Sequence, residues 1–547
     1  MALLGKVCNE FRAVSQLIIH FFKWPIINCL LVLVTGYCIS RIRRARFSYS
    51  DLPQPPHNAF LGHLIAMADV TRALPKDISP HIIFTQLQHK YNLGSLFTVD
   101  LRPFSPDKIL VIADPLLAKK VTRAPLLPKH PVNTAIISHV VGQKSLILSE
   151  GREWYAMRSI FAPGFAASKI ITLTSAVVDE TLIFCNILRQ HAQTGEVFRL
   201  WDATIALTID VIGRAILDVT FNSQTTENEF VGSLRKLILS TPDFGSMNPF
   251  EKLNLIRPFI HWRHGRKVEN YISKVIDERS RLATAKKTSK PVLDYALEEN
   301  ARNNQTIIPR HELKRVILDN MRSFIFAGHD TTASTLSYIY LMMERHPKAL
   351  AKVQQEHDEV FSTDLHQTAQ KIKEYPILLS RLPYTLAVIK EVLRLYPIGH
   401  PAKIVDEGYE IVHDDKKYTL KGTYLMMIAT HTMGRSPELF PNPDEFIPER
   451  FLPGAPGVAS TDAWRPFERG PRNCIGQELA LLEMKIAMVL TLRTFNVMSA
   501  IEEQKTSLGD YMSTLNGDPV YQVQGIAAKP KDGSPTRVKE RVFSVNK

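Results

Sequence analysis

Residues 467–476 read FERGPRNCIG and place Cys474 on a short loop that contains two glycines and a proline. An apolar pattern with helical spacing follows directly, formed by Leu479, Leu482, Ile486 and Val489. The thiol is therefore expected at the N-terminus of a helix, where the helix dipole favours an anion. Arg469 and Arg472 add positive charge to the loop. These features predict a thiolate, which in proteins is a nucleophile or a metal ligand.

The spacing of the cysteines limits which of these roles the thiolate can have. No second cysteine lies near Cys474, so a tetrahedral zinc site or an iron–sulfur cluster would lack ligands. A nucleophilic cysteine paired with one of the 18 histidines remains open, as does a buried structural cysteine. The pattern F-x-x-G-x-R-x-C-x-G resembles the haem-binding loop of the cytochrome P-450 family, in which a cysteine thiolate binds the iron.

The resemblance assigns a role to each residue of this loop. Cys474 is expected to be the metal ligand, the proximal thiolate on the iron of haem b. Phe467 is expected near the ring, where it shields the sulfur. Gly470 and Gly476 permit the turn and a close approach of the backbone. Arg472 is expected to pair with a haem propionate.

Composition narrows the class of partner. The chain has 547 residues and a formal charge of +13, from 67 basic and 54 acidic residues. A basic excess fits nucleic acid, an anionic membrane surface or an acidic protein partner. Basic runs interleaved with aromatic residues are missing, which argues against nucleic acid. Three of the five cysteines fall in the first 40 residues, so no disulfide framework is indicated and a reduced, cytosol-facing body is expected.

An uncharged run over residues 24–40 predicts a single transmembrane helix, near the lower length limit for a span. Four arginines follow within six residues, and the positive-inside rule then places the rest of the chain in the cytosol. A cleavable signal peptide and a buried core helix are the alternatives. The late start of the run disfavours the first and the arginine cluster disfavours the second.

Five segments follow from this reading. They are an apolar lumenal segment at 1–23, the transmembrane helix at 24–40, a basic and proline-rich hinge at 41–58, a catalytic domain at 59–530, and a basic tail at 531–547 that is expected to lack regular structure. The hinge resembles the one that sets the catalytic body against the membrane in microsomal members of the family. The expected location is the endoplasmic reticulum membrane, with one span and a cytosolic body.

Two more motifs match the same family. Trp154 and Arg158 lie one helical turn apart, on one face, and resemble the WxxxR pair that binds a haem propionate. A long helix expected from Pro309 to about Arg345 contains AGHDTT at 327–332. Gly328 is costly inside a helix, which calls for a reason such as the approach of a flat ligand. Thr331 can bond back to the preceding turn and open a groove for dioxygen.

A third set of residues resembles the buried Glu-Arg-Arg triad of the family. Glu391 and Arg394 are three residues apart on an amphipathic helix, and Arg450 follows in the stretch PERF. On its own, a Glu-x-x-Arg pair is more often an ordinary surface ion pair. In the family, the triad locks the loop that carries the ligand, here Cys474.

The resemblance, to microsomal-type members with a fungal character, implies a mainly α-helical fold with small β-sheets. It implies oxidation of a lipophilic small molecule, such as a fungal secondary metabolite, by hydroxylation, epoxidation or oxidative rearrangement. Asp330 and Thr331 would be the catalytic residues that supply protons on the side where dioxygen is activated. Electrons would come from NADPH through a membrane-bound cytochrome reductase, with cytochrome b5 as an optional second donor.

Two rival functions accompany this resemblance, and the chain departs from the family pattern in places, including Gly434-Arg435 where the family often has His-Arg. An oxygen-independent haem-thiolate isomerase or dehydratase would not need the acid–alcohol pair, and neither would a non-catalytic, membrane-anchored haem sensor. The propionate-binding arginine that the family commonly has after Pro397 is missing, and His400 or Lys403 is the candidate for that role. Glu468 stands where many members carry glycine or serine.

Overall fold

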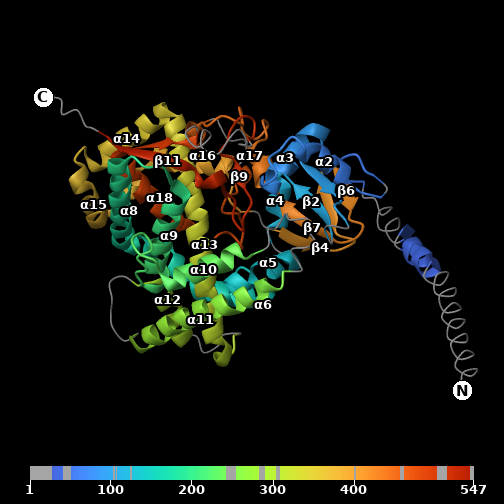
Figure 1. Ribbon diagram of the computed structural model, residues 1–547, viewed down its shortest axis with the longest axis horizontal. Helices are drawn as coiled ribbons and strands as arrows, with labels where there is room; N and C mark the ends of the chain where they lie inside the picture. The colour runs from blue at the N-terminus through green and yellow to red at the C-terminus, as the bar shows by residue number, and fades with distance from the viewer. Residues whose placement is uncertain are drawn as a thin grey trace, which may run out of the picture.

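The computed structural model describes residues 28–37, 39–40, 51–58, 60–102, 105, 107–123, 126–241, 254–282, 290–302, 308–399, 402–455, 461–501 and 514–541. The predicted span at 24–40 is therefore described only in part. Asn28–Tyr37 forms an apolar helix whose leucines and valines are exposed, and it lies apart from the body of the protein (Figure 1).

One described helical run, Ala167–Thr194, is long and apolar enough to cross a membrane. Half of its apolar window is buried, and its main helix, α8 (Thr174–Thr194), packs against α9, α18 and β11. Ala167–Thr194 is thus a core helix of the body.

A small sheet and three helices form the part of the body nearest the N-terminal helix (Figure 1). The sheet has the strand order β1-β2-β7-β4, in which only β2 and β7 are parallel. Its strands are β1 (Leu96–Val99), β2 (Lys108–Ile112), β7 (Tyr424–Ile428) and β4 (Ala402–Val405). Every residue of β1, β2 and β7 is buried, because the sheet is covered on both faces. The helices are α2 (Leu64–Thr71), α3 (Pro80–Tyr91) and α4 (Pro115–Val121).

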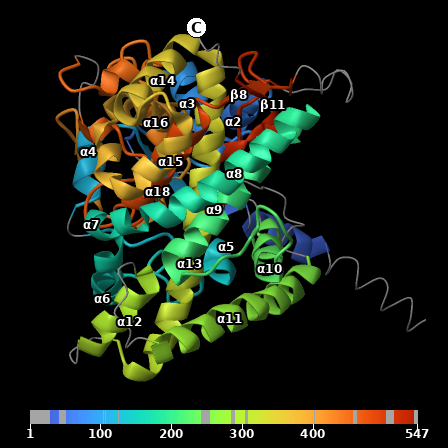
Figure 2. The same cartoon turned by 90° about the vertical axis from the view of Figure 1, so that its left-hand side faces the viewer.

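The remainder is mainly helical. Its helices are α5 (Pro131–Val141), α6 (Gly151–Phe161), α7 (Ala167–Ile170), α8, α9 (Leu200–Leu217), α10 (Glu229–Leu239), α11 (Ile256–Leu282), α12 (Val292–Arg302), α13 (Arg310–Arg345), α14 (Pro347–Phe361), α15 (Leu365–Glu374), α16 (Pro383–Leu395), α17 (Thr430–Gly434) and α18 (Gln477–Thr491). Figure 2 shows α11 along the lower edge, near α10 and α12. The prediction of a mainly helical chain with small sheets is confirmed.

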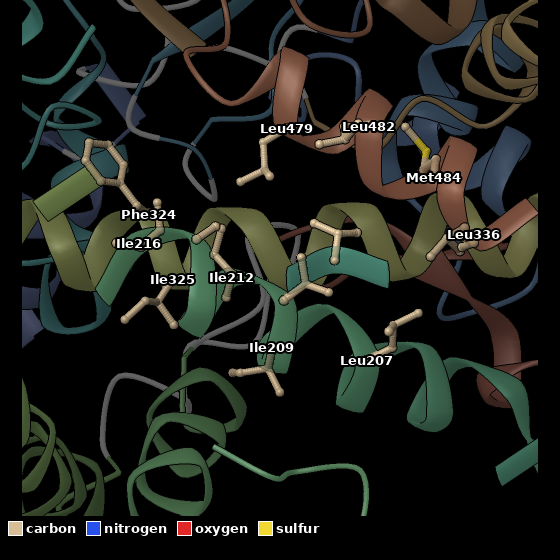
Figure 3. Close-up of a cluster of buried hydrophobic side chains, with 14 of the residues drawn as sticks. Leu207, Ile209, Ile212, Ile216, Phe324, Ile325, Leu336, Leu479, Leu482 and Met484 are labelled. Atoms are coloured by element: carbon tan, nitrogen blue, oxygen red, sulfur yellow. The ribbon is translucent and has the colours of Figure 1, made fainter. Parts of the chain in front are cut away.

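The long helix α13 organises this helical part. It begins directly after Pro309, as predicted, and packs against α5, α9, α11, α16 and α18. Figure 3 shows apolar side chains of α9 and α18 on opposite sides of α13, with Ile212 and Leu479 among them. These side chains belong to the largest buried apolar cluster of the described residues. Because the core holds α13 and α18 in place, groups on these two helices can be positioned across a shared space.

The C-terminal segment differs from the prediction. Residues 531–547 were expected to lack regular structure, but β11 (Pro535–Glu540) is the central strand of the sheet β3-β11-β8, with β3 (Phe198–Arg199) and β8 (Phe495–Ser499). The reason is tertiary, because Thr536 and Val538 are buried on one face of the strand. Two hairpins complete the strands, β5 (Glu410–His413) with β6 (Lys416–Thr419) and β9 (Gln522–Val523) with β10 (Lys529–Pro530).

Candidate functional site

The loop that carries Cys474 is closed by its own backbone. The Cys474 N–H donates to the carbonyl oxygen of Phe467 (2.8 Å), and the Asn473 N–H donates to that of Gly470 (3.1 Å). Gly470 has a φ of +83°, and a Cβ there would lie 2.6 Å from the carbonyl oxygen of Thr122. Only glycine fits that position. Gly476 is different, since its φ is −88° and a Cβ would lie 4.0 Å from the Cys474 Sγ.

Cys474 lies just before α18, as predicted. Burial raises the pKa of the thiol, against the backbone N–H groups of Gly476 and Gln477 and the charge of Arg158, which lower it. A metal ion bound to the sulfur would favour the thiolate, because coordination deprotonates a ligating thiol. The thiol is surrounded by protein but remains accessible, because it faces an internal cavity.

The cavity has a volume of about 560 Å³ and brings most of the predicted residues together. Cys474, Phe467 and Gly476 line it from the loop, Trp154 and Arg158 from α6, and Thr331 from α13. Arg472 also lines the cavity. Gly470 and Asp330 are not among the residues that line it. The cavity thus lies between a cysteine loop and the long central helix.

Two predicted arginines of the site are already engaged with protein groups. Arg158 donates from Nη1 to the carbonyl oxygen of Asn473 (2.9 Å) and from Nη2 to its Oδ1 (2.8 Å), so it also fixes the loop. Arg472 donates to the carbonyl oxygen of Ser149 (3.0 Å) and to Glu150 Oε2 (2.6 Å), and its guanidinium lies 4.5 Å from the centroid of the Trp154 ring. Trp154 and Arg472 therefore form one stacked unit.

Several donors on the cavity wall have no acceptor among the described residues. The Arg472 Nε and Arg465 Nη1 are buried without a partner. No hydrogen bond to a described residue is recorded for the indole N–H of the buried Trp154 or for the ammonium of Lys403, which is 6% exposed. Burial and the neighbouring charge of Arg472 lower the pKa of Lys403, against the opposing charges of Glu468 and Glu150. These donors predict that an anionic group occupies this edge of the cavity.

Lys129 is a further cation at the same edge, next to Lys403 through an isolated β-bridge between their backbones. Burial lowers the pKa of Lys129 to about 7, although its ammonium also donates to the carbonyl oxygens of Leu146, Ile147 and Ser149. Sequence reasoning missed Lys129 and Arg465, because no local pattern marks them. Lys403 was one of the two candidates for the missing arginine, and the other, His400, lies outside the described residues.

Glu468 explains one departure from the family pattern. Its φ is +53°, in the left-handed region where glycine is favoured. Its carboxylate accepts from Arg465 Nε (2.6 Å) and from the backbone N–H of Arg469 (2.9 Å). These contacts stabilise the strained backbone conformation of Glu468, and they orient the Arg465 side chain toward the cavity.

On α13, Thr331 and Gly328 face the cavity from neighbouring turns. The Thr331 hydroxyl donates to the carbonyl oxygen of Ala327 (2.8 Å), the predicted bond to the preceding turn. The reason for Gly328 was predicted only in part. It lines the cavity, but a Cβ there would also lie 2.5 Å from Cδ1 of Ile212, so a larger residue would make the Ile212 side chain shift where α9 crosses α13.

The structure brings Glu391, Arg394 and Arg450 together in a buried network. Glu391 accepts from Arg394 (2.7 and 2.8 Å) and from Arg450 Nε (3.1 Å), and all three residues are at most 6% exposed. Arg394 also donates to the carbonyl oxygens of Gly434, Pro443 and Glu445. The network therefore fixes the segment that precedes the cysteine loop.

A mainly helical fold in which a cysteine loop faces a long helix, across a cavity with a cationic edge, is the arrangement expected of a haem-thiolate protein. Comparison with known proteins points to the same class. The family model for cytochrome P450 matches residues 53–523. Cytochrome P450 monooxygenase acrF of Aspergillus aculeatus is 34% identical over 85% of this chain and 98% of its own length. Cytochrome P450 monooxygenase polC of Polytolypa hystricis is 33% identical over 90% of each chain.

A solved structure, the haem domain of cytochrome P450DA, has the same fold, with a TM-score of 0.72 and 23% identity over 90% of this chain and 99% of that one. The chain belongs to the cytochrome P450 family. It is a haem-dependent monooxygenase whose iron has a cysteine thiolate as axial ligand. Members of this class use dioxygen, an electron-donating partner and an organic substrate.

Proposed function

We propose that this P450 oxidises a lipophilic small molecule, such as a fungal secondary metabolite, with Cys474 as the axial ligand. The observation that carries the proposal is the cavity itself, which Cys474 and Thr331 enter from two different elements. The apolar side chains of Ile137, Phe324 and Ile526 support a lipophilic substrate. The test of this proposal combines purified protein, an NADPH-dependent reductase and candidate fungal extracts, and it identifies the products by mass spectrometry. Failure to form an NADPH-dependent product from any extract would count against it.

The haem, when bound, supplies the reductive activation of dioxygen and the insertion of an oxygen atom into a C–H or C=C bond. The residues of this chain would hold and orient it. The Cys474 sulfur would donate electron density to the iron, supported by the N–H groups of Gly476 and Gln477. The Arg472 Nε, which is buried without a partner, and the indole N–H of Trp154 on the cavity wall would hold the haem carboxylates.

We propose that Thr331 and Asp330 move protons on the distal side. The Thr331 hydroxyl proton is directed to the carbonyl oxygen of Ala327, which leaves the oxygen free to accept a hydrogen bond from the cavity. Asp330, the preceding residue of the helix, is buried outside the cavity and would exchange protons with water. The pair would thus pass protons from the Asp330 side of α13 to the cavity side.

The first prediction tests this relay. Thr331→Ala should keep haem binding and NADPH consumption, because no buried charge is stranded. Product per NADPH should fall about tenfold or more, at the low end of what general acid–base groups contribute, since water can replace the hydroxyl in part. The lost electrons should appear as hydrogen peroxide. Thr331→Ser, which keeps the hydroxyl, is the matched control. Equal product per NADPH in the alanine variant and the wild type would show that Thr331 does not take part in proton delivery.

The second prediction concerns Lys403, which we propose replaces the missing propionate-binding arginine. Lys403→Met should weaken haem retention about 10- to 100-fold, because one hydrogen bond between charged groups is worth roughly 1.5–3 kcal/mol. The rate of haem transfer to an apo-globin measures this. Lys403→Arg should retain haem as the wild type does. With haem dimethyl ester, whose carboxylates are blocked, wild type and Lys403→Met should not differ, and a persisting difference would contradict the assignment.

The third prediction concerns the membrane. We propose a single-pass anchor in the endoplasmic reticulum membrane with a cytosolic body, supported by the exposed apolar side chains of Asn28–Tyr37. The proposed hinge ends on the body, since Leu52 is buried and the Thr98 N–H donates to the carbonyl oxygen of Pro53 (2.9 Å). Deleting residues 1–46 should shift most of the protein to the soluble fraction. In sealed microsomes, added protease should digest the body of the full chain, and its protection would overturn the topology.

A further inference from the structure

Residues 129–149 form one wall of the cavity, and we call them the α5 segment. Six of them line the cavity, namely Lys129, Asn133, Ile136, Ile137, Leu146 and Ile147. The segment is closed at its base, because the Lys129 ammonium donates to the carbonyl oxygens of Leu146, Ile147 and Ser149. Helix α5 and the turn that follows it lie between these two ends. The position of α5 therefore sets the shape of this side of the cavity.

Buried polar side chains of α13 hold the turn after α5. Asp319 and Asn320 are both fully buried. Asp319 Oδ2 accepts from the backbone N–H of Lys144 (2.9 Å). Asn320 accepts from the Leu146 N–H (2.8 Å) through Oδ1, and its Nδ2 donates to the carbonyl oxygen of Lys144 (3.0 Å). Neither side chain lines the cavity, so α13 fixes this turn from behind the wall.

Arg322, one turn further along α13, holds the C-terminus of α5 itself. Its side chain is 3% exposed and does not line the cavity. Its Nε donates to the carbonyl oxygen of Val140 (3.1 Å), and its Nη2 donates to that of His139 (2.6 Å). The last carbonyl groups of a helix have no partner within it, and a cation is favoured beside them. Arg322 therefore supplies both the donors and the charge that cap α5.

The charge of Arg322 is balanced from α11. Glu269 accepts from Arg322 Nη1 (2.6 Å) and from Arg315 Nη2 (3.0 Å). If Arg322 were replaced, Glu269 would keep Arg315, so no buried carboxylate would be left alone. The His139 ring also stacks on His261 of α11, with 3.7 Å between the ring centroids. Replacing Arg322 should therefore loosen α5 without unfolding the region around it.

We propose that Arg322 is a positioning residue for substrate binding, because its cap on α5 holds Ile136 and Ile137 in place on the cavity wall. This inference rests on the proposed role of the cavity as the substrate site. Arg322 acts without touching haem, dioxygen or substrate, since α5 carries its effect to the cavity. A ligand large enough to reach α5 should depend on Arg322, whereas a small ligand that stays at the iron should not.

Two azole probes test the proposal on the haem-bound full chain. Imidazole is small, whereas clotrimazole carries a bulky triaryl group, and iron binding by either one shifts the Soret band. Arg322→Met should raise the dissociation constant of clotrimazole about tenfold, as expected when α5 keeps its binding position about a tenth of the time. The dissociation constant of imidazole should not change. Equal clotrimazole affinity in Arg322→Met and wild type would overturn the proposal, and so would an equal loss for both azoles, which would place the effect at the haem.

Arg315→Met is the matched control. It removes ion pairs with the same Glu269 (3.0 Å) and with Asp319 (3.0 Å), and Arg315 has no recorded hydrogen bond or ion pair with a described residue of the α5 segment. Both azoles should bind to Arg315→Met as they bind to the wild type. A loss of clotrimazole affinity equal to that of Arg322→Met would show that the ion pairs, rather than the cap on α5, are responsible.

Hydrogen exchange measures the hold on α5 without any ligand. Amides in the last turn of α5 should exchange about tenfold faster or more in Arg322→Met than in Arg315→Met, because hydrogen bonds from a charged group are lost. Equal exchange would contradict the proposal. Arg322→Lys gives the same comparison if the methionine variant does not fold, since lysine lacks the planar set of donors that reaches both carbonyl oxygens and Glu269. If neither azole changes the spectrum of the wild type, the proposed substrate cavity fails, whereas exchange still decides whether Arg322 holds α5.

Discussion

Replacing Cys474 by alanine should abolish the long-wavelength Soret band of the reduced carbon monoxide complex, the signature of thiolate-bound haem. The reason is chemical, since alanine has no sulfur and the band depends on electron donation from a thiolate. The loop itself should survive, because the Cys474 N–H bond to Phe467 and the contact of Gly470 with Thr122 do not use the side chain. The measurement is the absorption spectrum of the dithionite-reduced protein under carbon monoxide.

Cys185 provides the control for this expected result. It is the other described cysteine of the body, buried in the core with its thiol directed to the carbonyl oxygen of Leu490 (3.7 Å). Burial raises the pKa of Cys185 to about 12, and it does not line the cavity. Cys185→Ala should therefore leave the band unchanged. If the band persists in Cys474→Ala and disappears in Cys185→Ala, the axial ligand has been assigned to the wrong residue.

The parts of the site that could be predicted are those in which the chain itself sets the geometry. Residues 467–476 form one loop, and Trp154 and Arg158 lie one turn apart on α6. Spacing in the sequence then fixes spacing in the structure. Glu391 and Arg394 follow the same logic, but their meeting with Arg450 depended on the resemblance to the family.

The parts that could not be predicted come from contacts between distant segments. Lys129 and Arg465 reach the cavity from two separate loops, and neither position carries a local signal. The prediction that residues 531–547 lack regular structure was wrong for the same reason, because β11 is held by pairing with β8 rather than by its own composition. That Asp330 points away from the cavity could have been predicted, because successive residues of a helix point about 100° apart and Thr331 was expected to face the cavity.

The buried ion network around Glu391 has the contacts that make a carboxylate hard to replace. Glu391 is fully buried and accepts from Arg394, Arg450 and the backbone N–H of Ile447 (2.8 Å). The two arginines are buried as well, and other N–H groups of each donate to backbone carbonyl oxygens. Removing the carboxylate would leave two buried cations without a counter-charge.

Glu391→Ala should therefore destabilise the protein by about 3–5 kcal/mol, the cost of breaking a buried ion pair. Haem should be lost at a lower urea concentration, because the network holds the segment before the cysteine loop and Trp464 in that region donates to the carbonyl oxygen of Lys390 (2.9 Å). Urea titration of the thiolate-haem band measures this loss. Lys352→Met is the control, since it removes an exposed ion pair with Glu449 (2.6 Å), worth about 0–1 kcal/mol. Equal urea midpoints for the two variants would show that the buried network does not stabilise the haem-bound state more than a surface pair.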